Sequence, residues 1–252
     1  MSSLHLGLEA EDLDGATLAL LPGDPGRVPR IAENFDRPRH LVSAREYVSW
    51  LGYVNDQAVL LGSTGIGGPS LSIAVEELAQ IGIRTFLRVG TTGAIQPEMA
   101  PGEVVISTGA VRLDGASRHF APIEFPAVAD FGVVGALIES AVANGIAFHL
   151  GVTASSDTFY PGQARDGTFT GFLLPELRGS LETWRRLGVL SFEMEAATLF
   201  TMCSVMGLRA GAVCGVVVNR SEREDFDDAA VRVGEEGAIA VAVSAASLLT
   251  SI

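Results

Sequence analysis

The sequence predicts an α/β fold in which a mixed central β-sheet is flanked by α-helices. Apolar runs rich in Val, Ile and Leu alternate with segments of helical period, and the links between them are short. Such alternation is typical of a mostly parallel or mixed sheet with helices on its faces. The chain of 252 residues is 48% hydrophobic and shows no linker, repeat or low-complexity segment. We therefore expect a single domain over residues 1–252.

The first half of the chain predicts three strands and two helices. An apolar run at 16–24 ends in a Pro/Gly-rich turn, and the helical period follows at 28–35. A second strand is expected at 57–65, where an apolar run meets glycines. The segment 67–82 has apolar residues at helical spacing and ends in glycine, as helices often do. The third strand is expected at 85–93.

The second half continues the alternation around one Gly/Thr/Pro-rich loop. Strands are expected at 102–113, 147–160 and 209–220, helices at 127–145, 193–207 and 235–251, and the loop at 161–179. Ligands of such sheets lie beyond the carboxyl ends of the strands. The residues at which the strands end are therefore the candidates for a site.

The composition argues against several classes of function. A net charge of −13 disfavours binding to nucleic acid or to a membrane surface. All 17 basic residues are arginine, so Schiff-base chemistry and a P-loop lysine are excluded. The four histidines and two cysteines show no metal-ligand spacing. No apolar stretch is long enough to span a bilayer and no signal peptide is recognisable, so we expect a soluble, cytoplasmic protein.

Arginines at strand ends indicate an anion site. Arg27 closes "GDPGR", a turn that leads into a helix, where free N–H groups and the helix dipole favour an anion. Arg88 interrupts an apolar strand and is followed by two threonines, and Arg220 ends another strand. Guanidinium groups bind phosphate through paired donors. Arg27 and Arg88 are therefore expected to converge on one dianion.

Two further stretches suit the other parts of a nucleoside. In "FYPGQAR" (159–165) an aromatic residue precedes Gln163 and Arg165, which can bind a planar base with carbonyls beside an N–H, although an isolated stretch of this kind is more often an exposed loop. Glu193 and Glu195 precede a helix, where carboxylates either cap it or accept hydrogen bonds from ribose hydroxyls. "STGIGGPS" (63–70) does not fit the dinucleotide fingerprint, which argues against a Rossmann dehydrogenase.

Taken together, these stretches resemble the nucleoside phosphorylase family, which contains uridine-cleaving enzymes, purine nucleoside phosphorylases and nucleosidases. The uridine-cleaving members are the best match. The resemblance extends from residue 5 to about residue 220. It is carried by "HLGL" (5–8), "GDPGR", "SAREY" (43–47), "STGIGGPS", residues 74–97, "VRLDGAS", residues 119–131, residues 151–165, "EMEAATL" and "VVVNR".

The resemblance implies four groups of site residues, of which Arg88, Thr91, Arg165 and Glu195 would be catalytic. Phosphate would be bound by Gly23, Arg27, Arg88 and Thr91, with Arg45 contributed by a neighbouring subunit. Ribose would contact Thr91, Met194 and Glu195, with His5 donated across the same interface. The base would meet Thr92, Gly93, Phe159, Gln163, Arg165 and Arg220. A potassium ion between subunits would be held by Glu46, Ile66 and Ser70.

The resemblance also implies an activity and an assembly. The expected reaction is reversible phosphorolysis of uridine or deoxyuridine in pyrimidine salvage, a pentosyltransferase activity with phosphate as co-substrate and no organic cofactor. The expected assembly is a hexamer, a trimer of dimers with shared active sites. A purine nucleoside phosphorylase and a non-catalytic nucleoside-binding protein are the alternatives. The acidic stretch 221–229 corresponds to a flap over the base, and it leaves the choice among uridine, deoxyuridine and thymidine open.

Overall fold

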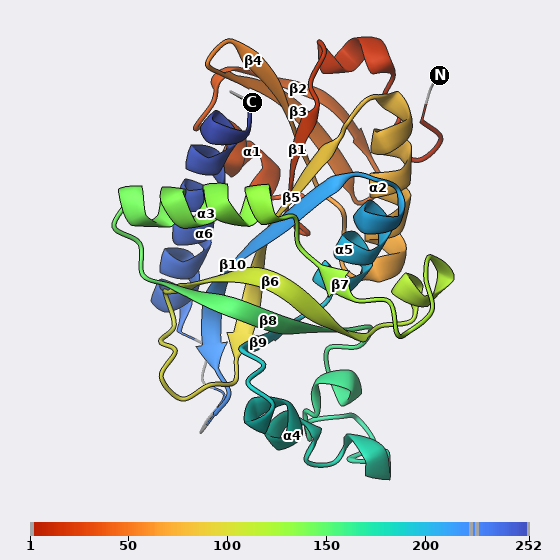
Figure 1. Cartoon of the computed structure of the whole chain (residues 1–252), viewed down its shortest axis with the longest axis vertical. Coiled ribbons are helices and arrows are strands. Elements are labelled where there is room, and N and C mark those ends of the chain that lie inside the picture. Colours follow the sequence, from red (N-terminus) through yellow and green to blue (C-terminus); the bar gives the residue numbers. More distant parts are fainter. Residues whose placement is uncertain (1–2, 222–223, 225–226, 251–252) are drawn as a thin grey trace.

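Ten strands form one mixed sheet in the part of the chain that the computed structural model describes, residues 3–221, 224 and 227–250. Helices cover both of its faces (Figure 1). The strands are β1 (Leu18–Leu21), β2 (Asp36–Ala44), β3 (Tyr47–Val54), β4 (Gln57–Gly62), β5 (Thr85–Ala94), β6 (Val104–Leu113), β7 (Ala127–Val128), β8 (Phe148–Ser156), β9 (Ser191–Glu193) and β10 (Arg209–Asn219). The α-helices are α1 (Arg27–Ala32), α2 (Gly68–Ile81), α3 (Phe131–Ala143), α4 (Ser180–Arg186), α5 (Ala196–Val205) and α6 (Asp228–Leu249). The predicted α/β fold with a mixed sheet is confirmed.

Part of the sheet closes on itself around β5. This strand pairs with β10 in parallel and with β9 in antiparallel orientation, and β10 connects through β6 and β8 back to β9. On its other side β5 pairs with β1, from which β4, β3 and β2 extend the sheet. Because β5 belongs to both parts, its side chains lie at the centre of the molecule.

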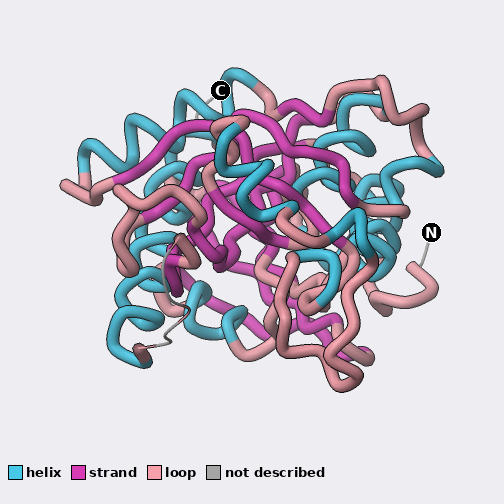
Figure 2. The backbone as a smooth tube through the Cα atoms, turned by 90° about the horizontal axis from the view of Figure 1, so that it is seen from below, coloured by secondary structure: helices cyan, strands magenta, loops and turns pink. Residues whose placement is uncertain are grey.

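The sheet is buried on both faces, which explains its unbroken apolar strands. Ala19 and Leu21 of β1 pack with α2 and α5, whereas Leu18 and Leu20 pack with α1, α3 and α6. Successive side chains of a strand point to opposite faces, so each face of β1 has its own core. Figure 2 shows the strands inside a shell of helices and loops. Among the described residues, no helix is long and apolar enough to cross a membrane.

The hairpin of β2 and β3 has no counterpart among the predicted elements. β2 is polar and mostly exposed, so it carries no apolar period. The turn that joins β3 to β4 could have been recognised in the sequence from its residue pair, Asn55 and Asp56. These two residues have φ angles of 50° and 57°. Two-residue hairpin turns of this hand favour Asn, Asp and Gly.

Two helices begin later than predicted. The segment 127–145 opens with β7, and α3 starts at Phe131 after Asp130, whose side chain accepts a hydrogen bond from the Val133 N–H. The segment 193–207 opens with the last residue of β9, and α5 starts at Ala196. Strands of two and three residues are too short for their period to be recognised in a sequence.

Candidate active site

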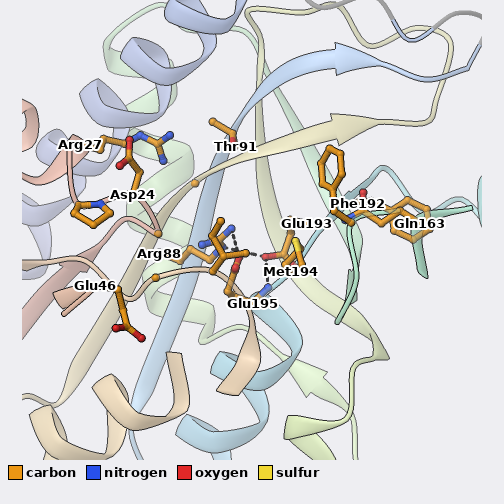
Figure 3. A pocket seen from close by; sticks show the side chains of 16 residues that line it. Asp24, Arg27, Glu46, Arg88, Thr91, Gln163, Phe192, Glu193, Met194 and Glu195 are labelled. Carbon is orange, nitrogen blue, oxygen red and sulfur yellow. Dashed lines mark hydrogen bonds and ion pairs between the residues drawn. The ribbon is translucent and has the colours of Figure 1, made fainter. Parts of the chain in front are cut away.

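A cavity of about 620 Å³ opens where β1, β4 and β5 end and β9 meets α5. This position agrees with the expectation that ligands lie beyond the carboxyl ends of strands. Charged side chains lie mainly toward the end with Arg27, and aromatic side chains lie at the opposite end, as Figure 3 shows. The lining residues are Gly23, Asp24, Pro25, Arg27, Glu46, Gly65, Ile66, Arg88, Gly90, Thr91, Phe159, Gln163, Phe192, Glu193, Met194 and Glu195.

Arg88 lies between two carboxylates in the wall of this cavity. Its Nε is 3.0 Å from Oε2 of Glu193, and its Nη2 is 2.5 Å from Oε2 of Glu195 (Figure 3). The side chain is only 6% exposed. Burial opposes its charge, but Glu195 and the other anionic neighbours raise the pKa of Arg88 above its ordinary value. The arginine that breaks the apolar run of β5 is therefore a buried cation with two counter-charges.

The two carboxylates have different surroundings. Oε2 of Glu193 accepts hydrogen bonds from the backbone N–H groups of Glu195 and Ala196, and its Oε1 accepts from the Ser155 hydroxyl. Glu193 thus caps the start of α5 and also pairs with Arg88. Oε1 of Glu195 accepts from the Gly67 N–H at 2.5 Å, at the start of α2. Burial raises the pKa of Glu195, although Arg88 opposes that shift.

Arg27 lines the same cavity as Arg88 and is likewise buried. Its Nη1 donates to the Val89 carbonyl at 3.3 Å, and its Nη2 donates to Oε1 of Glu235 at 2.6 Å. No sequence pattern singles out Glu235, because it lies in the charged first half of the long helix α6, far along the chain from Arg27. Burial acts against the ionised form of this carboxyl, but Arg30 and Arg27 lower its pKa.

The aromatic end of the cavity is built by the loop after β8. Phe159 and Gln163 line it, and the Arg165 guanidinium stacks on the Phe159 ring at 3.7 Å from its centroid. Arg165 Nη1 donates to Oε1 of Gln163 and, at 2.7 Å, to the Phe159 carbonyl. The Q-x-R stretch is therefore a buried, ordered unit rather than the exposed loop that an isolated motif would favour.

Two arginines and one carboxylate lie behind this loop. Nη2 of Arg220 donates to the Gln163 carbonyl at 2.7 Å, which joins the end of β10 to the loop. Oε1 of Glu224 accepts from Nε of Arg165 at 2.8 Å, and its Oε2 is 3.4 Å from Nε of Arg220. Glu224 belongs to the acidic stretch 221–229, of which residues 222–223 and 225–226 lie outside the described residues.

The threonines of β5 point in different directions. Thr91 lines the cavity, whereas the Thr92 hydroxyl is buried and donates to the Phe192 carbonyl at 2.8 Å. This alternation follows from the period of a strand. Gly93 is not among the lining residues, and a Cβ there would lie 3.1 Å from Cδ of Arg220.

His5 and Arg45, which were expected to serve a neighbouring subunit, are absent from the cavity wall of their own chain. His5 is anchored on α2, where its Nδ1 lies 2.6 Å from Oε1 of Glu77. Arg45 is exposed in the turn between β2 and β3, with a φ of 57°. Neither residue reaches the cavity within one chain.

The residues expected at a potassium ion lie near the mouth of the cavity. The Ser70 hydroxyl donates to Oε1 of Glu46 at 3.0 Å, and Ile66 is 76% exposed beside them. Hydrogen bonds from its own backbone N–H and from Ser70 lower the pKa of Glu46. No cluster of three or more His, Cys, Asp or Glu side chains that could hold a metal ion occurs among the described residues.

Comparisons with known proteins place the chain in a family. Residues 17–249 match the family model described as the phosphorylase superfamily. The chain is 56% identical to a uridine phosphorylase of Haemophilus influenzae over 98% of both chains, and 56% identical to a uridine phosphorylase of Escherichia coli over 97% of both. A guanosine phosphorylase of Halorubrum lacusprofundi is 38% identical over 89% of this chain and 88% of its own. The chain belongs to the phosphorylase superfamily.

Proposed function

We propose that this protein catalyses the reversible phosphorolysis of uridine to uracil and ribose 1-phosphate, a step of pyrimidine salvage. The observation that carries the proposal is the order of groups in one cavity: Arg27 and Arg88, then Glu195, then Gln163 (Figure 3). Such an order matches an anion, a sugar with hydroxyl groups and a planar base. The identity of 56% to uridine phosphorylases over nearly the whole chain supports the same substrate.

The proposed phosphate site lies at the cationic end of the cavity. Gly23 allows close approach of the backbone, Arg27 and Arg88 supply charged donors, and Thr91 supplies a hydroxyl. Arg45 of a neighbouring subunit completes this site in the proposal. The absence of Arg45 from the cavity of its own chain is compatible with a shared site.

The remaining subsites follow along the cavity. Ribose contacts Thr91, Met194 and Glu195, with His5 of a neighbouring subunit at the 5′-hydroxyl. Uracil lies against Phe159, with Gln163 and Arg165 on its carbonyl and N–H edge, and with Thr92, Gly93 and Arg220 behind them. Arg165 already stacks on Phe159 and donates to Gln163, so the base-binding unit is held in place before a ligand arrives.

The reaction needs no nucleophilic side chain. A phosphate oxygen forms a bond to C1′ as the bond from C1′ to N1 of uracil breaks, and the electron pair of that bond leaves with the base. Gln163 and Arg165 stabilise the negative charge that develops on uracil. When Glu193 and Glu195 are both ionised, they and Arg88 together carry one net negative charge. This charge favours the positive charge that develops on the sugar.

A purine substrate is the alternative within the same family, and the guanosine phosphorylase relative makes it worth testing. Purine recognition would require a carboxylic acid near N7 at the end of β10, where this chain has Asn219 and Arg220. The Asn219 side-chain N–H group donates to the carbonyls of Gln96 and Met99, and its oxygen accepts from the Ser221 N–H. This side chain is therefore engaged with the backbone.

The proposal includes an assembly and a location. We place the protein in the cytoplasm as a homohexamer built from dimers, with each pair of active sites shared across a dimer interface. Glu46, Ile66 and Ser70 would bind potassium at that interface; Glu46 and Ser70 supply oxygen ligands of the kind that such an ion prefers.

A nucleoside panel tests the function. Uridine, deoxyuridine, thymidine, inosine and guanosine are incubated with the protein, with and without phosphate, and the free base and the ribose or deoxyribose 1-phosphate are measured. We expect phosphate-dependent release of uracil as the fastest reaction. Faster cleavage of inosine or guanosine would contradict the uracil assignment, and cleavage without phosphate would indicate a nucleosidase. Tight uridine binding without turnover would indicate a binding protein.

A further inference from the structure

A carboxylate outside the cavity wall holds the guanidinium of Arg27. Glu235 lies on α6 and is 208 positions away from Arg27 in the chain. Its Oε1 accepts from Nη2 of Arg27 at 2.6 Å, and its Oε2 accepts from Nη1 of Arg30 at 2.7 Å. Arg27 and Arg30 are about one turn apart on α1. Each oxygen of this carboxylate therefore serves one arginine.

The backbone next to Glu235 is in direct contact with the sheet. The preceding residue, Gly234, is packed directly on β10, where a Cβ at Gly215 would lie 2.1 Å from the Gly234 carbonyl oxygen. A Cβ at Gly234 would in turn lie 2.8 Å from the Val216 carbonyl oxygen. The absence of side chains at these two glycines lets helix and strand touch through their backbones. Glu235 therefore projects from a fixed point.

Arg27 retains donors that no described residue uses. A guanidinium has five N–H groups, and those of Arg27 meet two acceptors, the Val89 carbonyl and Glu235. Its Nε is buried and has no hydrogen-bond partner among the described residues. A buried, unpartnered donor of a charged group is costly unless a ligand completes it. The guanidinium is thus held by the Val89 carbonyl and Glu235, and it keeps N–H groups that have no partner among the described residues.

We infer that Glu235 is a positioning residue for phosphate binding, an inference that rests on the phosphate role proposed above for Arg27. A carboxylate near an anion site weakens the attraction for phosphate, so its presence there is not explained by charge alone. Arg30 offsets the negative charge, and the three groups together carry one positive charge. The benefit of Glu235 is that it fixes the direction in which Arg27 presents its remaining donors.

Steady-state kinetics of Glu235→Gln tests this role. The amide keeps the size of the side chain but cannot accept from both arginines through two charged oxygens. We expect the KM for inorganic phosphate to rise roughly tenfold, while the KM for uridine changes less than about twofold. Glu236→Gln is the matched control, because Glu236 is the exposed neighbour on the same helix. A phosphate KM equal to that of the wild type, a lower one, or an equal rise in both KM values would overturn the inference.

Two further measurements keep the test decisive. If Glu235→Gln does not fold, Arg30→Gln replaces it: that change removes a half-exposed partner of the carboxylate and is expected to raise the phosphate KM roughly threefold. An unchanged phosphate KM in Arg30→Gln would then count against the inference. Inorganic phosphate is also titrated while the melting temperature is recorded, since a bound ligand stabilises the folded state. If the wild type does not turn over uridine, the proposed substrate is wrong, but the phosphate titration still tests the role of Glu235. We expect phosphate to raise the melting temperature of Glu235→Gln less than that of the wild type. An equal rise in the two proteins would contradict the inference.

Discussion

Arg88 shows how one side chain can serve both folding and catalysis. Its guanidinium balances Glu193 and Glu195, which hold the starts of α5 and α2 through the backbone N–H groups of Glu195, Ala196 and Gly67. The same guanidinium borders the cavity in which we place phosphate. A buried ion pair contributes little over an apolar replacement, but the loss of one partner strands the other charges.

Replacement of Arg88 by alanine should therefore lower both activity and stability. We expect phosphorolysis to fall at least about 100-fold and the free energy of unfolding near neutral pH to fall by about 3–5 kcal/mol.

Without Arg88 the pKa of Glu195, already raised by burial, rises further. A carboxyl whose pKa is higher in the folded than in the unfolded protein binds more protons in the folded state. The stability therefore falls as the pH rises from the pKa of the unfolded protein to the pKa of the folded one. The melting temperature of Arg88→Ala should be closest to that of the wild type at acidic pH, where Glu195 is protonated, and should deviate more as the pH rises and this carboxyl ionises.

A double variant separates the two roles of Arg88. In Arg88→Ala/Glu195→Gln one of the stranded charges is removed, so part of the stability lost at high pH should return. Activity should not return, because neither change restores a phosphate donor. Melting curves that are identical for the single and double variants across this pH range would contradict the account of Arg88 as a counter-charge.

The candidate site was predictable from the sequence where a residue breaks a local rule. Arg88 stands out because it is charged within a buried strand, and Arg27 because it follows a turn rich in glycine and proline. Glu235 breaks no rule, since a glutamate on the partly exposed side of a helix is ordinary. Its role depends on a contact across 208 positions of the chain, which no local pattern contains.

At the level of elements, sequence patterns were reliable where burial was complete. The strands β1, β4, β5 and β10 are buried along most of their length and were predicted close to their observed bounds. The exposed strand β2 was missed, because a polar edge strand is stabilised by its pairing with β3 rather than by its own side chains. The two- and three-residue strands β7 and β9 are likewise defined by their partners.

The contact between α6 and β10 gives a prediction at this scale. In Gly215→Ala the new Cβ would lie 2.1 Å from the Gly234 carbonyl oxygen, and no side-chain rotation can relieve this contact, because a Cβ is fixed by its own backbone and the oxygen belongs to the backbone of α6. We expect the free energy of unfolding to fall by about 2–3 kcal/mol, because helix and strand must separate. The matched control is Gly135→Ala on the exposed side of α3, where a Cβ meets nothing within 4 Å. Urea denaturation should show the control to be as stable as the wild type or more so; equal stability of both variants would refute the close packing.

The whole molecule leaves features that a single chain does not explain. Leu4 and Ile66 are 85% and 76% exposed, and they lie next to His5 and the mouth of the cavity, respectively. Exposed apolar side chains beside a site are typical of an interface. Two residues that we assign to substrate binding, His5 and Arg45, lie outside the cavity of their own chain. A dimer that covers Leu4 and Ile66 and exchanges His5 and Arg45 would account for both features.

Mixing of inactive variants tests this exchange. If each site uses Arg27 of one chain and Arg45 of the other, a mixed dimer of Arg27→Ala and Arg45→Ala contains one site with both changes and one intact site. Co-expression should therefore restore about a quarter of the wild-type activity, since about half of the dimers are mixed and each has one working site. Arg27→Ala with Glu195→Gln is the control: both residues line the cavity of the same chain, so every site in a mixed dimer is damaged. No recovery in the first pair would show that Arg45 does not cross the interface, and recovery in the control would contradict the assignment of Arg27 and Glu195 to one site of the same chain.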